Sequence, residues 1–262
     1  MLQESYLRRF SGIGRLYGMK ALEYLSGAYI IVVGLGGVGS WVVEALARSG
    51  INHLLVIDLD EICITNTNRQ IHAIEGNIGK NKAITLQKRV ALINPNCQVV
   101  AIEDFMTEDN VSEYIVKNCD FVVDCIDDAK VKSSILNYSK RNKIPIITVG
   151  GVGGKVDATK LQIKDLSQSY QDPLLAKTKQ NLKKRYGWKN KKFGIPCVFS
   201  SEQLRYPIND GVCFSKGALQ GVSSMDCSNG FGAITHMTGT AGFFVVNYVI
   251  NKMISKTNNS SS

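Results

Sequence analysis

A glycine-rich turn is the first pattern in this sequence that could support chemistry. Glycines occupy positions 34, 36, 37 and 39, between the apolar run 28–33 and a helix-like stretch that begins at Trp41. Glycine permits a tight bend and lets backbone N–H groups approach an anion at the start of a helix. Asp58 ends the next apolar run, where a carboxylate can accept hydrogen bonds from ribose hydroxyls. The spacing predicts a nucleotide site at Gly34, Gly36, Gly37, Gly39 and Asp58.

The polar residues after Asp58 narrow the class of nucleotide. The glycine turn and Asp58 alone would suit an enzyme that uses NAD or a flavin equally well. Asp60 follows, then the cluster Asn68-Arg69-Gln70, and Lys82 begins the next helix-like stretch. Arg69 and Lys82 can hold a triphosphate and stabilise charge that develops on the α-phosphate and on pyrophosphate. This combination favours ATP that is cleaved between its α- and β-phosphates, with Asp60 and Asn68 among the residues that bind it.

Asp127 is the candidate ligand for a metal ion. It lies just past the apolar run 121–123, in the segment Asp124-Cys-Ile-Asp127-Asp128. Open parallel sheets bind their ligands beyond the carboxyl ends of the strands. Mg²⁺ takes oxygen ligands from one or two carboxylates and from substrate phosphates. We therefore expect Asp127 to help hold Mg²⁺ and to take part in the reaction.

Short apolar runs that alternate with helix-like stretches must position these residues. The predicted strands are 28–33, 53–57, 99–102, 121–123 and 144–149, and the predicted helices are 41–48, 82–93, 111–116 and 131–142. This alternation predicts an α/β fold, Rossmann-like, with a mostly parallel sheet and helices on both faces. After Gly150 we expect an antiparallel strand over 156–163 and a buried C-terminal helix over 230–250. The expected domains are an ATP-binding core over 1–154 and an antiparallel extension over 155–262, packed together as one domain.

Positive charge is concentrated in one segment. The 262 residues carry 31 Lys and Arg against 22 Asp and Glu, a net charge of +9, and eight of the basic residues lie between Pro173 and Lys192 with no acid. Such an excess points to a phosphate-rich partner, although a solvated surface loop is the alternative. Tyr186 and Trp188 could stack on unpaired bases or pack locally. The candidate residues for binding a phosphate-rich partner are Lys183, Lys184, Arg185, Tyr186 and Trp188.

Cysteine usage and the chain start predict a cytoplasmic protein. The seven cysteines form no Cys-x-x-Cys pair, so we expect neither a structural zinc ion nor a disulfide framework. The segment 1–10 is polar and charged, unlike a secretory signal. The stretch 230–250 has no charged residue, but His236 and Asn247 make a buried helix a better interpretation than membrane association.

These motifs together resemble the adenylating superfamily of ThiF, MoeB and the ubiquitin-activating enzymes. The resemblance runs from about residue 9 to residue 154. It implies that ATP adenylates a carboxylate with release of pyrophosphate. It also implies a homodimer in which an N-terminal arginine reaches the partner's ATP, for which Arg15 is the best candidate and Arg9 the second. The motifs that carry it are Gly34-x-Gly-Gly-x-Gly39, Asp58-x-Asp60, Asn68-Arg69-Gln70, Lys82 and Asp127.

The distal half resembles a narrower group, the tRNA threonylcarbamoyladenosine dehydratases. This resemblance implies that ATP drives cyclisation of a modified adenosine beside the anticodon, so that tRNA is the partner. No enzyme thioester is required, and whether Cys197 or Cys227 takes part stays open. The segments that carry the resemblance are Arg15-Leu-Tyr-Gly18, Thr65–His72, Lys143-Ile-Pro145, Gln171-Asp-Pro173, Cys197-Val-Phe-Ser200, Met225-Asp-Cys227 and Gly230-Phe-Gly232.

Two other functions stay open from the sequence. One is adenylation of the C-terminal glycine of a ubiquitin-like sulfur carrier, although such activators usually carry a zinc site of two Cys-x-x-Cys pairs. The other is a non-catalytic scaffold that binds tRNA or a protein partner. A cysteine desulfurase system is a further candidate partner, and no residue in the sequence bears on it.

Overall fold

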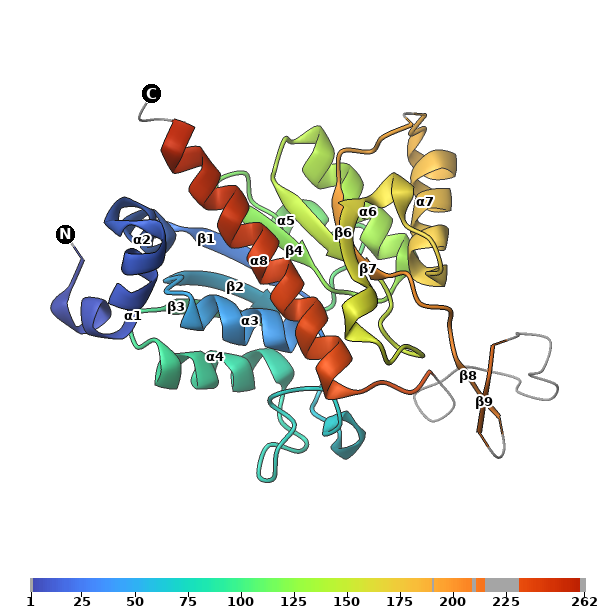
Figure 1. Ribbon diagram of the computed structural model, residues 1–262, viewed down its shortest axis with the longest axis horizontal. Helices are drawn as coiled ribbons and strands as arrows, with labels where there is room; N and C mark the ends of the chain where they lie inside the picture. Colours follow the sequence, from blue (N-terminus) through green and yellow to red (C-terminus); the bar gives the residue numbers. More distant parts are fainter. Residues whose placement is uncertain (1, 190, 209–210, 215–230, 260–262) are drawn as a thin grey trace.

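The apolar runs of the sequence form the central strands of a seven-stranded sheet (Figure 1). β1 (Tyr29–Val33), β2 (His53–Ile57), β4 (Phe121–Asp124) and β5 (Ile146–Val149) are buried along almost their whole length. Parallel strands that are covered on both faces are mostly apolar, which explains the lack of polar alternation. The computed structural model describes residues 2–189, 191–208, 211–214 and 231–259.

The sheet is parallel except at one edge. Its strand order is β3-β2-β1-β4-β5-β7-β6, with β3 (Gln98–Ile102) at one edge and β6 (Leu161–Asp165) at the other. β6 pairs antiparallel with β7 (Pro196–Ser200), whereas the other neighbouring strands are parallel. β8 (Tyr206–Ile208) and β9 (Gly211–Cys213) form a separate antiparallel pair. The predicted mostly parallel sheet with an antiparallel continuation is confirmed.

Helices cover both faces of the sheet, as the sequence predicted. One face packs against α2 (Met19–Gly27), α3 (Gly39–Arg48), α4 (Lys82–Ile93) and α8 (Thr235–Asn259). The other face packs against α5 (Val111–Tyr114), α6 (Ala129–Arg141) and α7 (Pro173–Tyr186). Figure 1 shows α8 crossing its face diagonally.

The C-terminal helix, α8, starts at Thr235, later than expected from the uncharged stretch, and continues beyond that stretch to Asn259. It packs on the sheet and on α3. Met237, Ala241, Val245 and Val249 recur every four residues and are fully buried. At Gly242 a Cβ would lie 3.0 Å from the Trp41 Cβ, so glycine permits close helix packing. Among the described residues, no helix is long and apolar enough to cross a membrane.

The N-terminal helices lie beside the amino ends of the first strands. α1 (Glu4–Tyr17) ends where Gly18 adopts a positive φ of 91°, and α2 then leads directly into β1. The Tyr6 hydroxyl donates to the carbonyl oxygen of Gly50, which precedes β2. Tyr6 also packs with Phe10 and Leu22 in a small cluster of its own. These contacts fix α1 at the end of the sheet opposite the glycine turn.

The predicted antiparallel strand begins later than expected. Residues 158–160 form a single 3-10 turn because the Asp157 carboxylate accepts the Thr159 N–H, and β6 starts only at Leu161. β6 and β7 belong to the expected extension over 155–262, yet they continue the sheet that the preceding residues form.

The basic segment is mainly a helix rather than a loop. α7 begins after Asp172, whose carboxylate accepts the Leu175 N–H at 3.0 Å, and ends at Gly187, whose φ is 69°. Leu175 and Leu182 are fully buried in the core between α7 and the sheet. Lys177, Lys183, Lys184 and Arg185 lie on exposed positions of this helix.

Candidate active site

One edge of the sheet is formed by the loops that follow β1, β2, β4, β5 and β7. Because β1, β2, β4, β5 and β7 run in the same direction, the residues after them must meet at their carboxyl ends. Those residues are Gly34, Asp58, Cys125, Gly150 and Ser201. The edge they form is called here the carboxyl edge, and it holds most of the residues predicted to bind ATP.

The glycine turn is shaped by steric requirements at two positions. Gly34 has a φ of 84°, and a Cβ there would lie 3.0 Å from the Cys125 carbonyl carbon. A Cβ at Gly39 would collide with the Gly34 carbonyl oxygen. Gly36, by contrast, faces open space, with only the Gln70 side chain within 4 Å. α3 begins at Gly39, so the free N–H groups of a helix start lie beside this space, as anion binding requires.

Asp58 links the glycine turn to the segment after β2. Its carboxylate accepts the N–H of Leu35 at 2.7 Å and the N–H of Asp60 at 2.9 Å. Burial raises the pKa of Asp58 above its usual value. Each carboxylate oxygen keeps lone pairs beyond the one used, so the fixed side chain can also accept ribose hydroxyls.

Lys82 and Asp60 form an ion pair between the start of α4 and the loop that follows β2. The Lys82 Nζ lies 2.7 Å from Asp60 Oδ2, and only 8% of the lysine side chain is exposed against 52% of the aspartate side chain. Asn81 caps α4 by accepting the Ile84 N–H, and its amide donates to the carbonyl oxygen of Leu59. The cap and the ion pair hold a positive charge beside Asp58.

Arg69 lies against the glycine turn and is held by two helices. A Cβ at Gly37 would lie 3.5 Å from Cγ and Cδ of Arg69. The Arg69 carbonyl oxygen accepts Trp41 Nε1 on α3 and Thr238 Oγ1 on α8, both at 3.1 Å. Its guanidinium donates to the Thr65 carbonyl oxygen and leaves further N–H groups for a ligand.

Asn68 connects Arg69 to the C-terminal part of the chain. Its side-chain oxygen accepts Arg69 Nη1 at 2.9 Å, and its amide donates to the Ala233 carbonyl oxygen at 2.8 Å. The Thr235 hydroxyl donates to the Asn68 carbonyl oxygen at 2.6 Å. Residues 68 and 69 are therefore held by the residues that begin α8.

Asp127 and Asp128 have different surroundings although they are adjacent. Asp128 accepts the N–H groups of Lys130 and Val131 and caps α6. Asp127 is exposed at the carboxyl edge, where no described residue pairs or hydrogen-bonds with its carboxylate. No group of three potential ligand side chains exists in the described part of the chain. An exposed carboxylate of this kind can supply one oxygen ligand to Mg²⁺, which takes its other ligands from phosphates and water.

Three buried side chains near Asp127, called the trio, were not predicted from the sequence. Lys132 Nζ lies 2.8 Å from Asp124 Oδ2 and 3.1 Å from Thr148 Oγ1, and Thr148 Oγ1 donates to the same carboxylate at 2.7 Å. All three side chains are fully buried. They join β4, α6 and β5 just before the loop that carries Asp127. The signal in the sequence was a carboxylate inside an apolar strand, which needs a buried partner.

Two other predicted residues lie away from this edge. Arg15 lies in the last turn of α1, is exposed, and donates to Ser11 Oγ at 3.4 Å. Arg9 is exposed on the same helix. No contact in the described ranges joins either arginine to the glycine turn, so a role at a partner's ATP stays a prediction.

The candidate tRNA-binding residues divide into two groups. Arg185 pairs with Glu108 at 2.6 Å, and this contact is the main cause that lowers the pKa of Glu108 to about 2. The Tyr186 hydroxyl also donates to Glu108, and Trp188 Nε1 donates to Asn137. Both aromatic side chains pack partly into the core. Lys183 and Lys184 are exposed and pair with no other described residue.

Among the described residues, no hydrogen bond or ion pair joins a cysteine to His72. Burial raises the pKa of Cys197 far above its usual value and that of Cys125 to about 12. Cys227 lies outside the described residues. His72 is 1% exposed, neither ring nitrogen has a hydrogen-bond partner in the described ranges, and burial lowers its pKa to about 4.

Comparison with known proteins assigns the chain to a family. A sequence profile of the ThiF family matches residues 9–262. A tRNA threonylcarbamoyladenosine dehydratase of Escherichia coli K12 is 47% identical over 260 residues, which cover 98% of this chain and 97% of the relative. A dehydratase of the same name from Haemophilus influenzae is 49% identical and covers 97% of this chain and 96% of its own. The E. coli dehydratase solved with ATP has a TM-score of 0.88 at 43% identity, with 99% of both chains covered. The chain belongs to the ThiF family.

Proposed function

We propose that this protein catalyses the ATP-dependent dehydration of threonylcarbamoyladenosine in tRNA through a carboxyl-adenylate, with release of AMP and pyrophosphate. The observation that carries the proposal is the glycine turn, Asp58, Arg69 and Lys82 gathered at one edge of the sheet. Identity of 47% over nearly the full length to a dehydratase of that name supports the same reaction.

The side chains divide the binding of ATP among them. Asp58 accepts the ribose hydroxyls, and the N–H groups at the start of α3 receive the phosphates across Gly36. Arg69 and Lys82 stabilise charge on the α-phosphate and on the departing pyrophosphate. When Mg²⁺ is bound, Asp127 holds it, and the ion neutralises phosphate charge.

The reaction then needs two substitutions. A carboxylate oxygen of the threonyl group attacks the α-phosphorus, and the bond from that phosphorus to the bridging oxygen breaks, so that pyrophosphate leaves. A nitrogen or oxygen of the same modification next attacks the activated carbonyl carbon, loses its proton, and displaces AMP. The ring closes and the carboxylate oxygen departs in AMP, so water is lost overall. Attack within one molecule has a high effective concentration.

The basic helix α7 supplies the surface for tRNA in this proposal. Lys183 and Lys184 are exposed and can neutralise phosphates of the polyanion. Because the substrate is tRNA, we place the reaction in the cytoplasm. We also propose a homodimer in which Arg15 reaches the ATP of the partner subunit, since α1 presents Arg15 to solvent.

Mass analysis of tRNA nucleosides tests the reaction. tRNA that carries threonylcarbamoyladenosine is incubated with the protein, ATP and Mg²⁺, and digested. We expect the modified nucleoside to lose the mass of one water, with one AMP formed per product. Samples without ATP and samples with unmodified tRNA are the controls. ATP–pyrophosphate exchange that depended on a small carrier protein and not on tRNA would overturn the proposal.

A further inference from the structure

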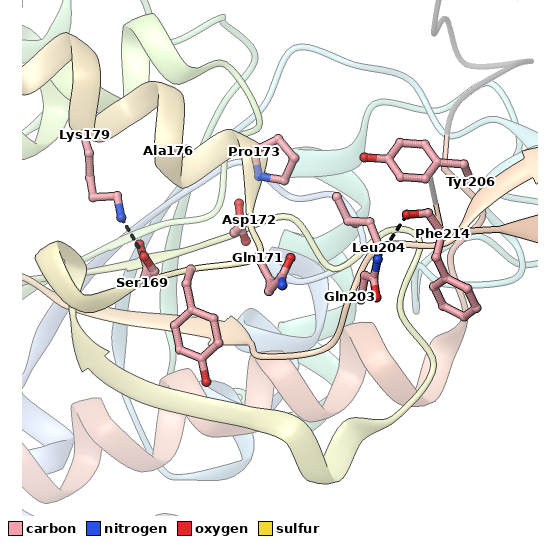
Figure 2. A pocket seen from close by; sticks show the side chains of 11 residues that line it. Ser169, Gln171, Asp172, Pro173, Ala176, Lys179, Gln203, Leu204, Tyr206 and Phe214 are labelled. Atoms are coloured by element: carbon pink, nitrogen blue, oxygen red, sulfur yellow. Dashed lines mark hydrogen bonds between the residues drawn. The ribbon is translucent and has the colours of Figure 1, made fainter. Parts of the chain in front are cut away.

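A cavity of about 360 Å³ lies between the amino end of α7 and the segment that follows β7 (Figure 2). This volume suits a small organic group rather than several linked nucleotides. The side chains that matter for its chemistry are Gln171, Pro173, Ala176, Gln203, Leu204 and Tyr206.

The cavity lies on the carboxyl edge, next to the loop after β5. Asp172 lines it, and a Cβ at Gly150 would collide with the Asp172 carboxylate. Gln203 and Leu204 follow β7, whose carboxyl end lies at the same edge as those of β1, β2, β4 and β5. The cavity and the glycine turn therefore lie at the same edge of the sheet, beside different strands.

Residues 231–233 connect the wall of the cavity to Asn68, one of the residues predicted to bind ATP. The Tyr206 ring packs on the Phe231 ring with centroids 5.3 Å apart. Gly154 accepts the Arg205 N–H at its carbonyl oxygen and donates its own N–H to Gly232 at 2.7 Å. Ala233 in turn accepts the Asn68 amide at 2.8 Å. Residues 231–233 therefore connect Asn68 to the cavity.

The lining combines apolar walls with free polar groups. Tyr206 is 6% exposed, and no described residue hydrogen-bonds with its hydroxyl, which Figure 2 shows directed toward Pro173. The Gln171 amide also has no partner among the described residues. Gln203 donates to the Phe214 carbonyl oxygen at 3.1 Å and keeps its own oxygen as an acceptor. Amides and a hydroxyl beside apolar walls can read the edge of an unpaired nucleobase.

The backbone at the mouth of the cavity is held in a rare conformation. Gln171 has a φ of 54°, which is uncommon for a residue other than glycine and costs free energy. The Gln171 carbonyl oxygen accepts the ammonium of Lys155 at 2.9 Å, and that ammonium also donates to Ser200 at 2.8 Å. Lys155 is only 1% exposed. A buried lysine thus fixes the backbone of Gln171, whose side-chain amide borders the cavity.

We propose that this cavity receives one unpaired nucleobase of the tRNA substrate, read by Gln171, Gln203 and Tyr206. This inference rests on the proposed function. α7 borders the cavity at Pro173 and Ala176 and carries the exposed Lys183 two turns further on, a rise of about 10 Å from Ala176. A base in the cavity leaves its sugar and phosphates outside, within reach of the basic face of α7. The base and the backbone are then held by different parts of one helix.

Filling the cavity tests the proposal. Ala176 is exposed on α7, so Ala176→Phe places a ring in the cavity without changing the core. We expect KM for modified tRNA to rise roughly tenfold or more, the scale of one lost stacking contact. KM for ATP and the slope of log Kd for tRNA against log salt concentration should stay unchanged, because no phosphate contact is lost. Gln180→Phe, one turn further along the same helix and outside the cavity, is the matched control.

Tyr206→Phe provides a second variant that keeps the ring and its packing. It should raise KM for modified tRNA severalfold, while Tyr248→Phe on α8 should not. Unchanged KM for tRNA in both cavity variants, or an equal rise for ATP, would overturn the nucleobase site while leaving the dehydratase reaction intact. Failure of the wild-type protein to convert modified tRNA would overturn the reaction and the cavity proposal together.

Discussion

At the scale of single residues, two adjacent aspartates have different surroundings, and we propose different tasks for them. Asp127 has a carboxylate that no described residue engages, whereas Asp128 is used to cap α6. A residue that holds a ligand and a residue that holds the fold can therefore be distinguished by matched substitutions at neighbouring positions.

We predict that Asp127→Ala abolishes product formation and leaves the unfolding free energy within about 0.5 kcal/mol of wild type, because the side chain is exposed. Asp128→Ala should lower that free energy by about 1 kcal/mol through loss of the cap and retain turnover. Nucleoside mass analysis and urea denaturation measure the two effects. Wild-type turnover by Asp127→Ala would remove this residue from the chemistry.

The buried His72 predicts how stability depends on pH. Burial lowers its folded-state pKa to about 4, against an ordinary value of 6.5. Between these values the unfolded chain binds more protons than the folded chain, so this contribution is complete above pH 6.5 and is lost as pH falls toward 4. The loss amounts to about 3 kcal/mol. Urea denaturation from pH 7 to pH 4 should show it, and His72→Gln should have a flatter profile. Equal slopes for both proteins would contradict the prediction.

At the scale of elements, the Asp124–Lys132–Thr148 trio joins three of them below the loop that carries Asp127. Breaking a buried ion pair leaves an uncompensated charge, which costs more than the pair itself contributes. We infer that these fully buried side chains help to fix the position of the loop.

We predict that Lys132→Met lowers the unfolding free energy by roughly 3–5 kcal/mol, because Asp124 stays buried without its cation. Adding Asp124→Leu to Lys132→Met should restore part of that stability. Chemical denaturation of the two single variants and the double variant measures the coupling. Additive losses would show that the two side chains act independently.

The second element of interest is α7, whose charge is only partly available to a ligand. Arg185 is paired with Glu108, whereas Lys183 and Lys184 are not paired with described residues. We predict that Lys183→Gln with Lys184→Gln weakens tRNA binding and reduces the salt slope by about 1.5, since each lysine contributes roughly 0.7 to 0.9. Filter binding at several salt concentrations measures this slope.

Lys20→Gln with Lys88→Gln is the control for that pair. These two lysines are exposed on α2 and α4, which cover the opposite face of the sheet from α7. The control changes net charge by the same amount and should leave the slope unchanged. Equal changes in both double variants would mean that overall charge, and not the α7 surface, governs binding.

Much of the fold follows from local sequence. The predicted strand 53–57 and the predicted helix 82–93 coincide with β2 and α4, because an apolar run and an amphipathic repeat are local properties. The helix of the basic segment was not predicted, although Asp172, Pro173 and Gly187 provide its start and stop signals. Its dense charge obscured the narrow apolar stripe that Leu175 and Leu182 form.

The site is less predictable where partners are far apart in sequence. Gly34, Asp58 and Lys82 could be named because each lies at a recognisable point of a motif. The buried trio could not be predicted, because no local sequence pattern indicates that Lys132 pairs with Asp124 and Thr148. The pairing of Arg185 with Glu108 is likewise non-local, because it joins α7 to the loop between β3 and α5.

At the scale of the whole molecule, the proposed dimer predicts that two inactive variants restore activity when their subunits are mixed. Arg15→Ala and Asp127→Ala should each be inactive. If Arg15 serves the partner's ATP, mixed dimers of the two variants contain one complete site, so equal mixing should recover roughly a quarter of wild-type activity. Turnover assays after subunit exchange measure the recovery. No recovery would place Arg15 at its own chain's site or outside the reaction.

The contact between Asn68 and Ala233 also has a consequence for biosynthesis. The ATP motifs all lie before residue 130, yet residues 68 and 69 are held by Ala233, Thr235 and Thr238. A nascent chain exposes its glycine turn long before the ribosome has synthesised these residues. The segment that holds residues 68 and 69, which we propose to bind ATP, is completed only after the start of α8 has emerged, so nucleotide turnover by unfinished chains should be disfavoured.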